Sequence, residues 1–160
     1  MDFTTHNQFL ERCFAPATEE ELAYLENELG YSLPPDYREF LQQVNGGWIS
    51  GGIYCRAPGQ ATNVTTLYGF AFQDDRSNIL LALDAYEFKE RVPPFYIPIA
   101  DAQMFYRVTL CLSGPATGAV FDWRPMEEWE AVPDPTEQYL TQIAPSFTAF
   151  WRGLDWANYR

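Results

Sequence analysis

Residues 18–47 read TEEELAYLENELGYSLPPDYREFLQQVNGG, a stretch that predicts two consecutive helices. Thr18 and Glu21 have the spacing of a capping box, in which each side chain satisfies a backbone N–H group that the first helical turn leaves free. The leucines that follow recur at helical spacing: Leu22, Leu25 and Leu29. Glycine is the usual residue in the left-handed conformation that ends a helix, so the first helix is expected to end at Gly30.

The second helix is expected to begin at Pro35, because a proline in the first turn lacks only an N–H group that has no helical partner. Four apolar side chains follow with the spacing i, i+3, i+4 and i+7: Tyr37, Phe40, Leu41 and Val44. Such a stripe is typical of a helix that buries one face. The sequence Asn45-Gly46-Gly47 accepts positive φ angles, so it is expected to end this helix.

The middle of the chain has the composition of a sheet, with short β-branched and aromatic runs separated by Gly, Pro, Asn and Asp. The expected strands are Ile53–Arg56, Val64–Phe70, Phe95–Ala100, Met104–Leu112 and Gly118–Trp123. The tight connection Ser113-Gly114-Pro115 between the last two strands predicts a hairpin. Gly51 and Gly52 are expected to form a turn that leads into the first strand.

Two further helices are expected, one over Leu83–Arg91 and one that starts at Pro145. The later helix carries another apolar stripe: Phe147, Phe150, Trp151 and Leu154. Helices at both ends with strands between them predict an α+β fold, in which the N-terminal helix pair and the C-terminal helix pack on a mainly antiparallel, twisted sheet. A chain of 160 residues fits one domain, so residues 1–160 are expected to fold as a single unit.

The chain is strongly acidic, with 22 Asp and Glu against 10 Lys and Arg and a formal net charge of −12. Nucleic acids and anionic membranes attract positive surfaces, so neither is expected as a partner. A basic protein fits this charge, and long-range attraction would speed its binding. The sequence shows neither a secretory signal nor a membrane-spanning stretch, which predicts a cytoplasmic protein. We also expect a monomer.

The residue types present do not indicate catalysis or metal binding. Three cysteines are widely spaced and form no zinc-binding pattern: Cys13, Cys55 and Cys111. A nucleophile needs a neighbouring base, and the single histidine, His6, offers only a pairing with Cys13. The aspartates that could form a catalytic pair lie on different expected elements: Asp74, Asp75, Asp101 and Asp122. We therefore expect no enzyme activity, no cofactor and no metal site.

Large aromatic rings are mixed with charges in residues 121–129, which read FDWRPMEEW. Tryptophan and arginine are among the residue types enriched at protein interfaces. This segment and an earlier acidic pair supply the candidate partner-binding residues: Asp74, Asp75, Asp122, Trp123, Glu127, Glu128, Trp129 and Glu130. Two alternatives stay open, because the tryptophans can seal a sheet edge and the acids can belong to a solvated loop.

Several motifs, taken in order, resemble those of the SUKH superfamily, the Smi/Knr-type domains. The motifs are the helix pair of residues 18–47, Ile97–Asp101, Cys111-Leu112, Gly118–Trp123 and the helix that follows Ala144-Pro145-Ser146-Phe147. The resemblance covers residues 17–154. One position departs from the family pattern, since members often carry a Gly-Gly-Asp-type turn where this chain has Ala102-Gln103-Met104.

The resemblance implies an α+β fold with a helix pair packed against a twisted sheet. It also implies function by binding, because bacterial SUKH proteins are similar to immunity proteins that neutralise a cognate toxin domain, often a nuclease, of polymorphic toxin or contact-dependent inhibition systems. A nuclease has a positive groove for its substrate, which an acidic protein can cover. Fungal relatives are regulatory binding proteins, so a regulatory or scaffolding module with an endogenous partner is the alternative.

Overall fold

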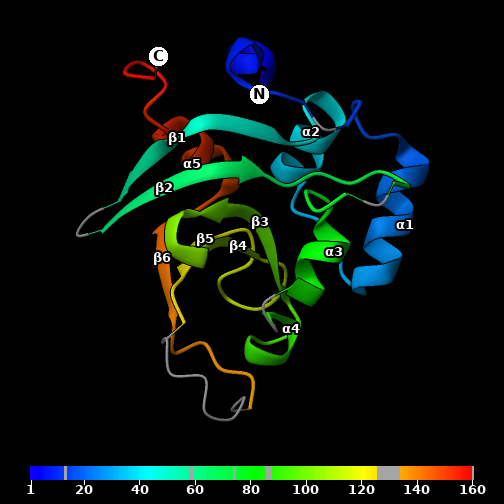
Figure 1. The fold of residues 1–160 in the computed structure, drawn as a ribbon. Helices are drawn as coiled ribbons and strands as arrows, with labels where there is room; N and C mark the ends of the chain where they lie inside the picture. Colours follow the sequence, from blue (N-terminus) through cyan, green and yellow to red (C-terminus); the bar gives the residue numbers. More distant parts are fainter. Residues whose placement is uncertain (13, 58–59, 74, 86–87, 126–133, 160) are drawn as a thin grey trace.

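The computed structural model describes residues 1–12, 14–57, 60–73, 75–85, 88–125 and 134–159 (Figure 1). Its helices are η1 (Thr4–Phe9), α1 (Glu19–Leu29), α2 (Pro35–Gln43), α3 (Ile79–Asp84), α4 (Phe88–Arg91), η3 (Gln103–Phe105) and α5 (Phe147–Gly153). Its strands are β1 (Gly47–Ala57), β2 (Gln60–Leu67), β3 (Tyr96–Ala102), β4 (Arg107–Cys111), β5 (Val120–Trp123) and β6 (Leu140–Ala144). Helices at both ends with strands between them confirm the predicted α+β fold.

The N-terminal helix pair forms as the sequence predicts. The Glu21 backbone N–H donates to Thr18 Oγ1 at 3.1 Å, and the Thr18 N–H donates to the Glu21 carboxylate at 3.1 Å, which completes the capping box. Gly30 ends α1 with a φ of +76°. Arg38 of α2 then joins the two helices, because its guanidinium contacts two glutamates of α1 at 2.8 and 3.0 Å.

A left-handed turn follows α2, also as predicted, with φ angles of +60° at Asn45 and +83° at Gly46. The fully buried Asn45 amide donates to the carbonyls of Ala15 and Phe70 at 2.7 and 2.8 Å. Its Oδ1 accepts a hydrogen bond from the Phe70 N–H at 2.8 Å. Asn45 therefore joins the end of α2 to the N-terminal segment and to the chain that follows β2.

The described strands form one six-stranded antiparallel sheet, in which each strand pairs with the next along the chain. The predicted hairpin is confirmed, since β4 pairs with β5. The predicted turn at Gly51 and Gly52 is wrong, because both lie inside β1 with φ angles of +76° and +75°. They occupy a break in the pairing register between Trp48 and Ile53, so these glycines bend a strand that has already begun.

Several other elements differ from the prediction. The expected helix over Leu83–Arg91 is replaced by α3 and α4, and α3 begins earlier because Asn78 Oδ1 accepts a hydrogen bond from the Leu80 N–H at 2.9 Å. Strand β4 begins at Arg107, since residues 103–105 form η3. Strand β6 was not predicted. Most of its residues are exposed or half-exposed, so its sequence has no strong apolar pattern.

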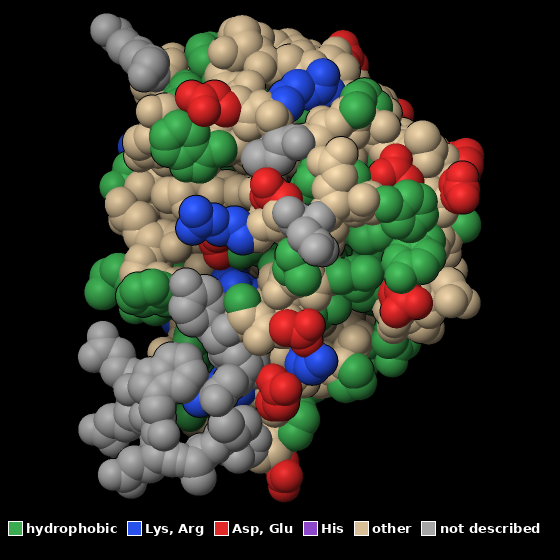
Figure 2. Space-filling view, turned by 45° about the vertical axis from the view of Figure 1, so that its right-hand side comes forward, with side chains coloured by type: hydrophobic (Ala, Val, Ile, Leu, Met, Phe, Trp, Pro, Cys, Tyr) green, Lys and Arg blue, Asp and Glu red, His purple; other side chains and the backbone are tan. Residues whose placement is uncertain are grey.

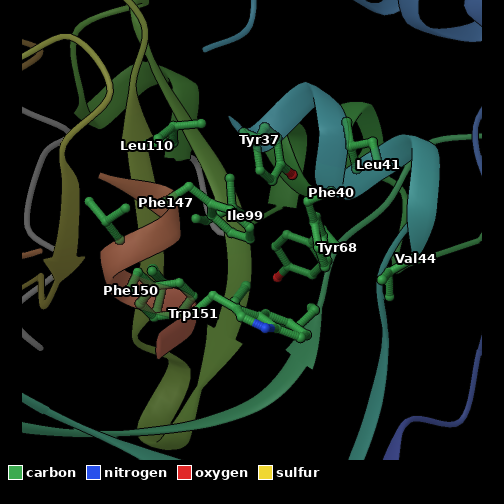
Figure 3. Packing of buried hydrophobic residues seen from close by; sticks show 14 of the residues in the cluster. Tyr37, Phe40, Leu41, Val44, Tyr68, Ile99, Leu110, Phe147, Phe150 and Trp151 are labelled. Atoms are coloured by element: carbon green, nitrogen blue, oxygen red, sulfur yellow. The ribbon is translucent and has the colours of Figure 1, made fainter. Parts of the chain in front are cut away.

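The main core lies between the sheet and helices α1, α2 and α5. Figure 3 shows the aromatic side chains of α2 and α5 directed into the same interior around Ile99 of β3. Phe3 joins them from the start of the chain, with its ring centroid 5.7 Å from those of Phe40, Phe147 and Trp151. The N-terminal segment, α2 and α5 therefore share one aromatic cluster.

The two ends of the chain lie on the same side of the molecule (Figure 1). The His6 ring stacks on Trp156 with centroids 4.5 Å apart. Asp36 of α2 also holds α5, because its carboxylate accepts a hydrogen bond from the Thr148 N–H at 2.8 Å. These contacts join residues that are far apart in the sequence, which places the terminal elements together against the sheet.

A second, smaller core involves α4 and consists of Phe88, Val92, Tyr96, Cys111 and Trp123. Successive residues of a strand face opposite sides of a sheet. Trp123 in this cluster and Asp122 beside it therefore point to opposite faces of β5.

Candidate protein-binding surface

The predicted contact residues are only partly covered by the structure. Asp74 and residues 127–130 lie outside the described residues. Asp75 lies in the loop between β2 and α3 and is half-buried. Its carboxylate accepts a hydrogen bond from the Ser77 backbone N–H at 2.8 Å, so the loop itself fixes the position of this acid.

Asp122 and Trp123 are buried, with exposed fractions of 0% and 1%. The Trp123 ring packs edge-on against Phe88, with centroids 5.0 Å apart. Asp122 Oδ2 accepts hydrogen bonds from Thr62 Oγ1 at 2.9 Å and from Arg124 Nε at 2.7 Å. Neither side chain presents a surface to a partner, which corrects their assignment as direct contact residues. They are consecutive residues of β5, and each is buried on a different face of that strand.

The Asp122 carboxylate affects the pKa of Cys55. Burial, with a further contribution from the charge of Asp122, raises the pKa of the Cys55 thiol to about 11. Thiolates, not thiols, are nucleophiles, so Cys55 is poorly suited to covalent catalysis. The partly exposed guanidinium of Arg124 binds the buried Asp122 carboxylate. It also lies 4.8 Å from the centre of the Tyr106 ring.

Two aromatic rings are exposed together beside α1. Tyr24 on α1 is 44% exposed and Phe72, in the segment after β2, is 57% exposed. Their rings meet edge to face with centroids 5.1 Å apart. The buried ring of Phe70 lies 5.9 Å from Tyr24 and 5.8 Å from Phe72, so it supports both from below.

Two exposed glutamates accompany these rings. Glu20 and Glu28 lie four residues on either side of Tyr24, which places all three on one face of α1. Glu20 and Glu28 form no ion pair or hydrogen bond within the described residues, and α1 has no basic residue. Figure 2 shows hydrophobic side chains gathered on this side of the molecule with acidic ones at their edges. We call Glu20, Tyr24, Glu28 and Phe72 the acidic–aromatic surface.

The other acids of α1 have structural partners. Glu19 and Glu26 bind Arg38, and Glu21 completes the capping box. Hydrogen bonds from Arg38 hold the pKa of Glu19 below its usual value. Glu20 and Glu28 are therefore the glutamates of α1 that have no ion-pair or hydrogen-bond partner among the described residues.

The loop that carries Phe72 also contributes to a hollow of about 330 Å³. Its polar lining is Tyr68, Asp75, Arg76, Asp101 and Arg107, and Leu81, which is 41% exposed, lies among them. Asp75 is thus the one predicted contact residue in the described part of the chain that combines partial exposure with a place in a hollow.

The hollow has a buried cation in its wall. Arg107 is 2% exposed, and its Nε lies 3.8 Å from a carboxylate oxygen of Asp101. The guanidinium also donates to the Ala82 carbonyl and lies 5.8 Å from the centre of the Tyr68 ring. The Tyr68 hydroxyl donates to the same carboxylate. These contacts explain the Asp101–Arg107 pair as a structural link between β3, β4 and α3.

The described residues contain no group of three or more His, Cys, Asp and Glu side chains placed to hold a metal ion. Cys55 and Cys111 are buried free thiols, and Cys13 lies outside the described residues. Partial burial lowers the pKa of His6, whose ring stacks on Trp156. The geometry of His6 is therefore that of a packed aromatic side chain.

Sequence reasoning missed the acidic–aromatic surface. The stripe that buries α1 runs through Leu22 and Leu25, and Tyr24 falls outside it. A large ring off the buried stripe, with acids at i−4 and i+4, is a signal that could have identified this face. Phe72 carried no comparable signal, because only the folded chain brings it against Tyr24.

The helix pair, the antiparallel sheet and the closing helix define an α+β domain, and in its described part no helix is both long and apolar enough to cross a membrane. The chain belongs to the SMI1/KNR4 family (SUKH-1), whose model matches residues 16–153. This match confirms the resemblance seen in the sequence. No curated protein matches the chain.

Proposed function

We propose that this protein is an immunity protein that binds a basic toxin domain and neutralises it. Membership of the SMI1/KNR4 family supports the proposal, because SUKH domains include immunity proteins. The observation that carries it is the acidic–aromatic surface, in which the exposed Tyr24 and Phe72 rings lie with Glu20 and Glu28, two acids without a basic partner among the described residues.

The surface has the chemistry of one side of a protein interface. Aromatic rings bury a large apolar area when a partner covers them. The acids beside them select a basic partner, and a net charge of −12 accelerates the encounter. A toxin that cleaves nucleic acid carries the positive groove that such a surface can cover. Inhibition by coverage needs no catalysis and no cofactor from this protein, and the complex would form in the cytoplasm.

The experiment is co-expression of this protein with the toxin-like protein encoded beside its gene. Restored growth and co-purification of the two proteins are expected, with an affinity that falls as salt is added, since salt screens exposed charges. A toxin inactivated at its catalytic residue is the control, because it should co-purify without affecting growth. Failure of both growth rescue and co-purification contradicts the proposal and favours an endogenous regulatory partner.

A further inference from the structure

The connection between β3 and β4 has an unusual backbone for its residues. Met104 and Phe105 have φ angles of +62° and +65°. The Tyr106 N–H donates to the Gln103 carbonyl at 3.2 Å, so these two residues are the centre of a tight turn. Positive φ at both central positions is the pattern of a type I′ turn, which favours Asn and Gly there. Methionine and phenylalanine adopt it only with strain.

The same two side chains are the most exposed large hydrophobic residues in the described structure. Met104 is 69% exposed and Phe105 is 71% exposed. Small polar residues would form this turn more easily and leave less apolar surface in water. Strain and exposed apolar area at one site indicate a function outside the fold.

The base of the turn is held firmly. The Ala102 N–H donates to the Tyr106 carbonyl at 2.9 Å. The guanidinium of Arg124 lies 4.8 Å from the centre of the Tyr106 ring, and the buried Asp122 binds that guanidinium at 2.7 Å. The tip is therefore presented in a fixed orientation, which reduces the entropy that a contact there would lose on binding.

We propose that the Met104–Phe105 tip inserts into an apolar pocket of the protein partner, as a contact separate from the acidic–aromatic surface. This inference rests on the proposed function. Methionine and phenylalanine are both enriched in the centres of protein interfaces. A lipid surface fits less well, because a chain of net charge −12 is repelled by anionic membranes and two side chains make a weak anchor.

The test is the double variant Met104→Asn/Phe105→Gly, which supplies the residues that the turn prefers. Retained or increased resistance to urea is expected, together with at least about 30-fold weaker binding of the co-expressed toxin, the loss typical of a central contact. Trp48→Asn is the matched control, since Trp48 is another large exposed ring, at 44%, on β1. The control should keep its affinity.

Five outcomes overturn the inference. Wild-type affinity in the double variant removes the tip as a contact while the proposed function stands, whereas wild-type protein that binds no toxin refutes both. A double variant that is less stable than the wild type assigns the tip a structural role. Light scattering that shows a wild-type dimer and a monomeric variant assigns it to self-association. Co-sedimentation with phosphatidylglycerol vesicles that the double variant loses assigns it to a membrane.

Discussion

The buried carboxylate of Asp122 lies 2.7 Å from Nε of Arg124, a side chain that is 37% exposed. The two side chains form an ion pair between a carboxylate buried in the sheet and a partly exposed guanidinium. Arg124 also donates to the Ala61 carbonyl at 3.0 Å, so it spans from β5 to β2. Asp122 thus holds the Arg124 side chain in the position from which it reaches β2.

Replacing Asp122 with asparagine should destabilise the protein. The substitution keeps the size of the side chain but removes the charge that Thr62 and Arg124 bind. Hydrogen bonds to charged groups each contribute about 1.5–3 kcal/mol, so a loss of about 1–3 kcal/mol in the free energy of unfolding is expected. Urea denaturation measures it, with Asp134→Asn as the exposed control. Equal stability of the two variants contradicts the assigned role of Asp122.

Under the proposed function, charge reversal on α1 should slow association with the toxin. The variant Glu20→Lys/Glu28→Lys changes the acidic–aromatic surface, whereas Glu11→Lys/Glu90→Lys makes the same change in net charge at exposed sites elsewhere. An association rate about tenfold lower at low salt is expected for the first variant only, because charges beside the contact steer the encounter. Surface plasmon resonance over a salt series measures it.

Circular dichroism must show that both charge variants stay folded. If both slow association equally, net charge alone acts, and the acidic–aromatic surface is not the site that Glu20 and Glu28 were proposed to form.

The Cys55 thiol should make stability fall at alkaline pH. Its pKa is about 11 in the folded chain, against roughly 8.5 for an unperturbed cysteine. Between these values the unfolded chain loses the proton and the folded chain keeps it, so stability decreases as pH rises. The difference in free energy of unfolding between wild type and Cys55→Ala should be constant below about pH 8 and shrink by up to about 1.4 kcal/mol per pH unit above it.

Urea titrations from neutral pH to pH 10 test this dependence on Cys55. A difference that stays constant over the whole range would show that the thiol titrates at its ordinary pKa.

Asn45 should be important for stability through both its side chain and its backbone. Asn45→Ala removes the hydrogen bonds to Ala15 and Phe70 and forces alanine into a φ of +60°. A loss of about 3 kcal/mol is expected from the unpaired buried groups alone. Asn45→Gly relieves the backbone strain and should be about 1 kcal/mol more stable than the alanine variant. Thermal unfolding compares the two, and identical stabilities contradict the contribution from strain.

The helix pair could be predicted because its signals are local. The Thr18–Glu21 capping box and the glycine at position 30 act within one or two turns of chain, and the structure contains both. The helix expected over Leu83–Arg91 was wrong, because Asn78 caps a helix that starts earlier, at Ile79, and the extended backbone of Ala85 ends that helix after Asp84. Strand β6 depends on pairing with β5 rather than on its own pattern, so only the folded sheet defines it.

The candidate site was less accessible to sequence reasoning. Asp122 and Trp123 lie in a segment of charged and aromatic residues that has the composition of an interface. In the structure both are buried, on opposite faces of β5. Conversely, Tyr24 and Phe72 are far apart in the sequence and meet only after folding. Exposure is a property of the whole fold, and for these residues local composition carries little information about it.

The aromatic cluster around Phe3 has a consequence for synthesis of the protein. Phe3 and Phe40 leave the ribosome before Phe147 and Trp151, which pack against Phe3 in the folded chain. A nascent chain therefore keeps these rings uncovered until α5 has been synthesised. Under the proposed function, a message cut before α5 yields no partial antidote, and protection of the cell begins only after α5 has been synthesised.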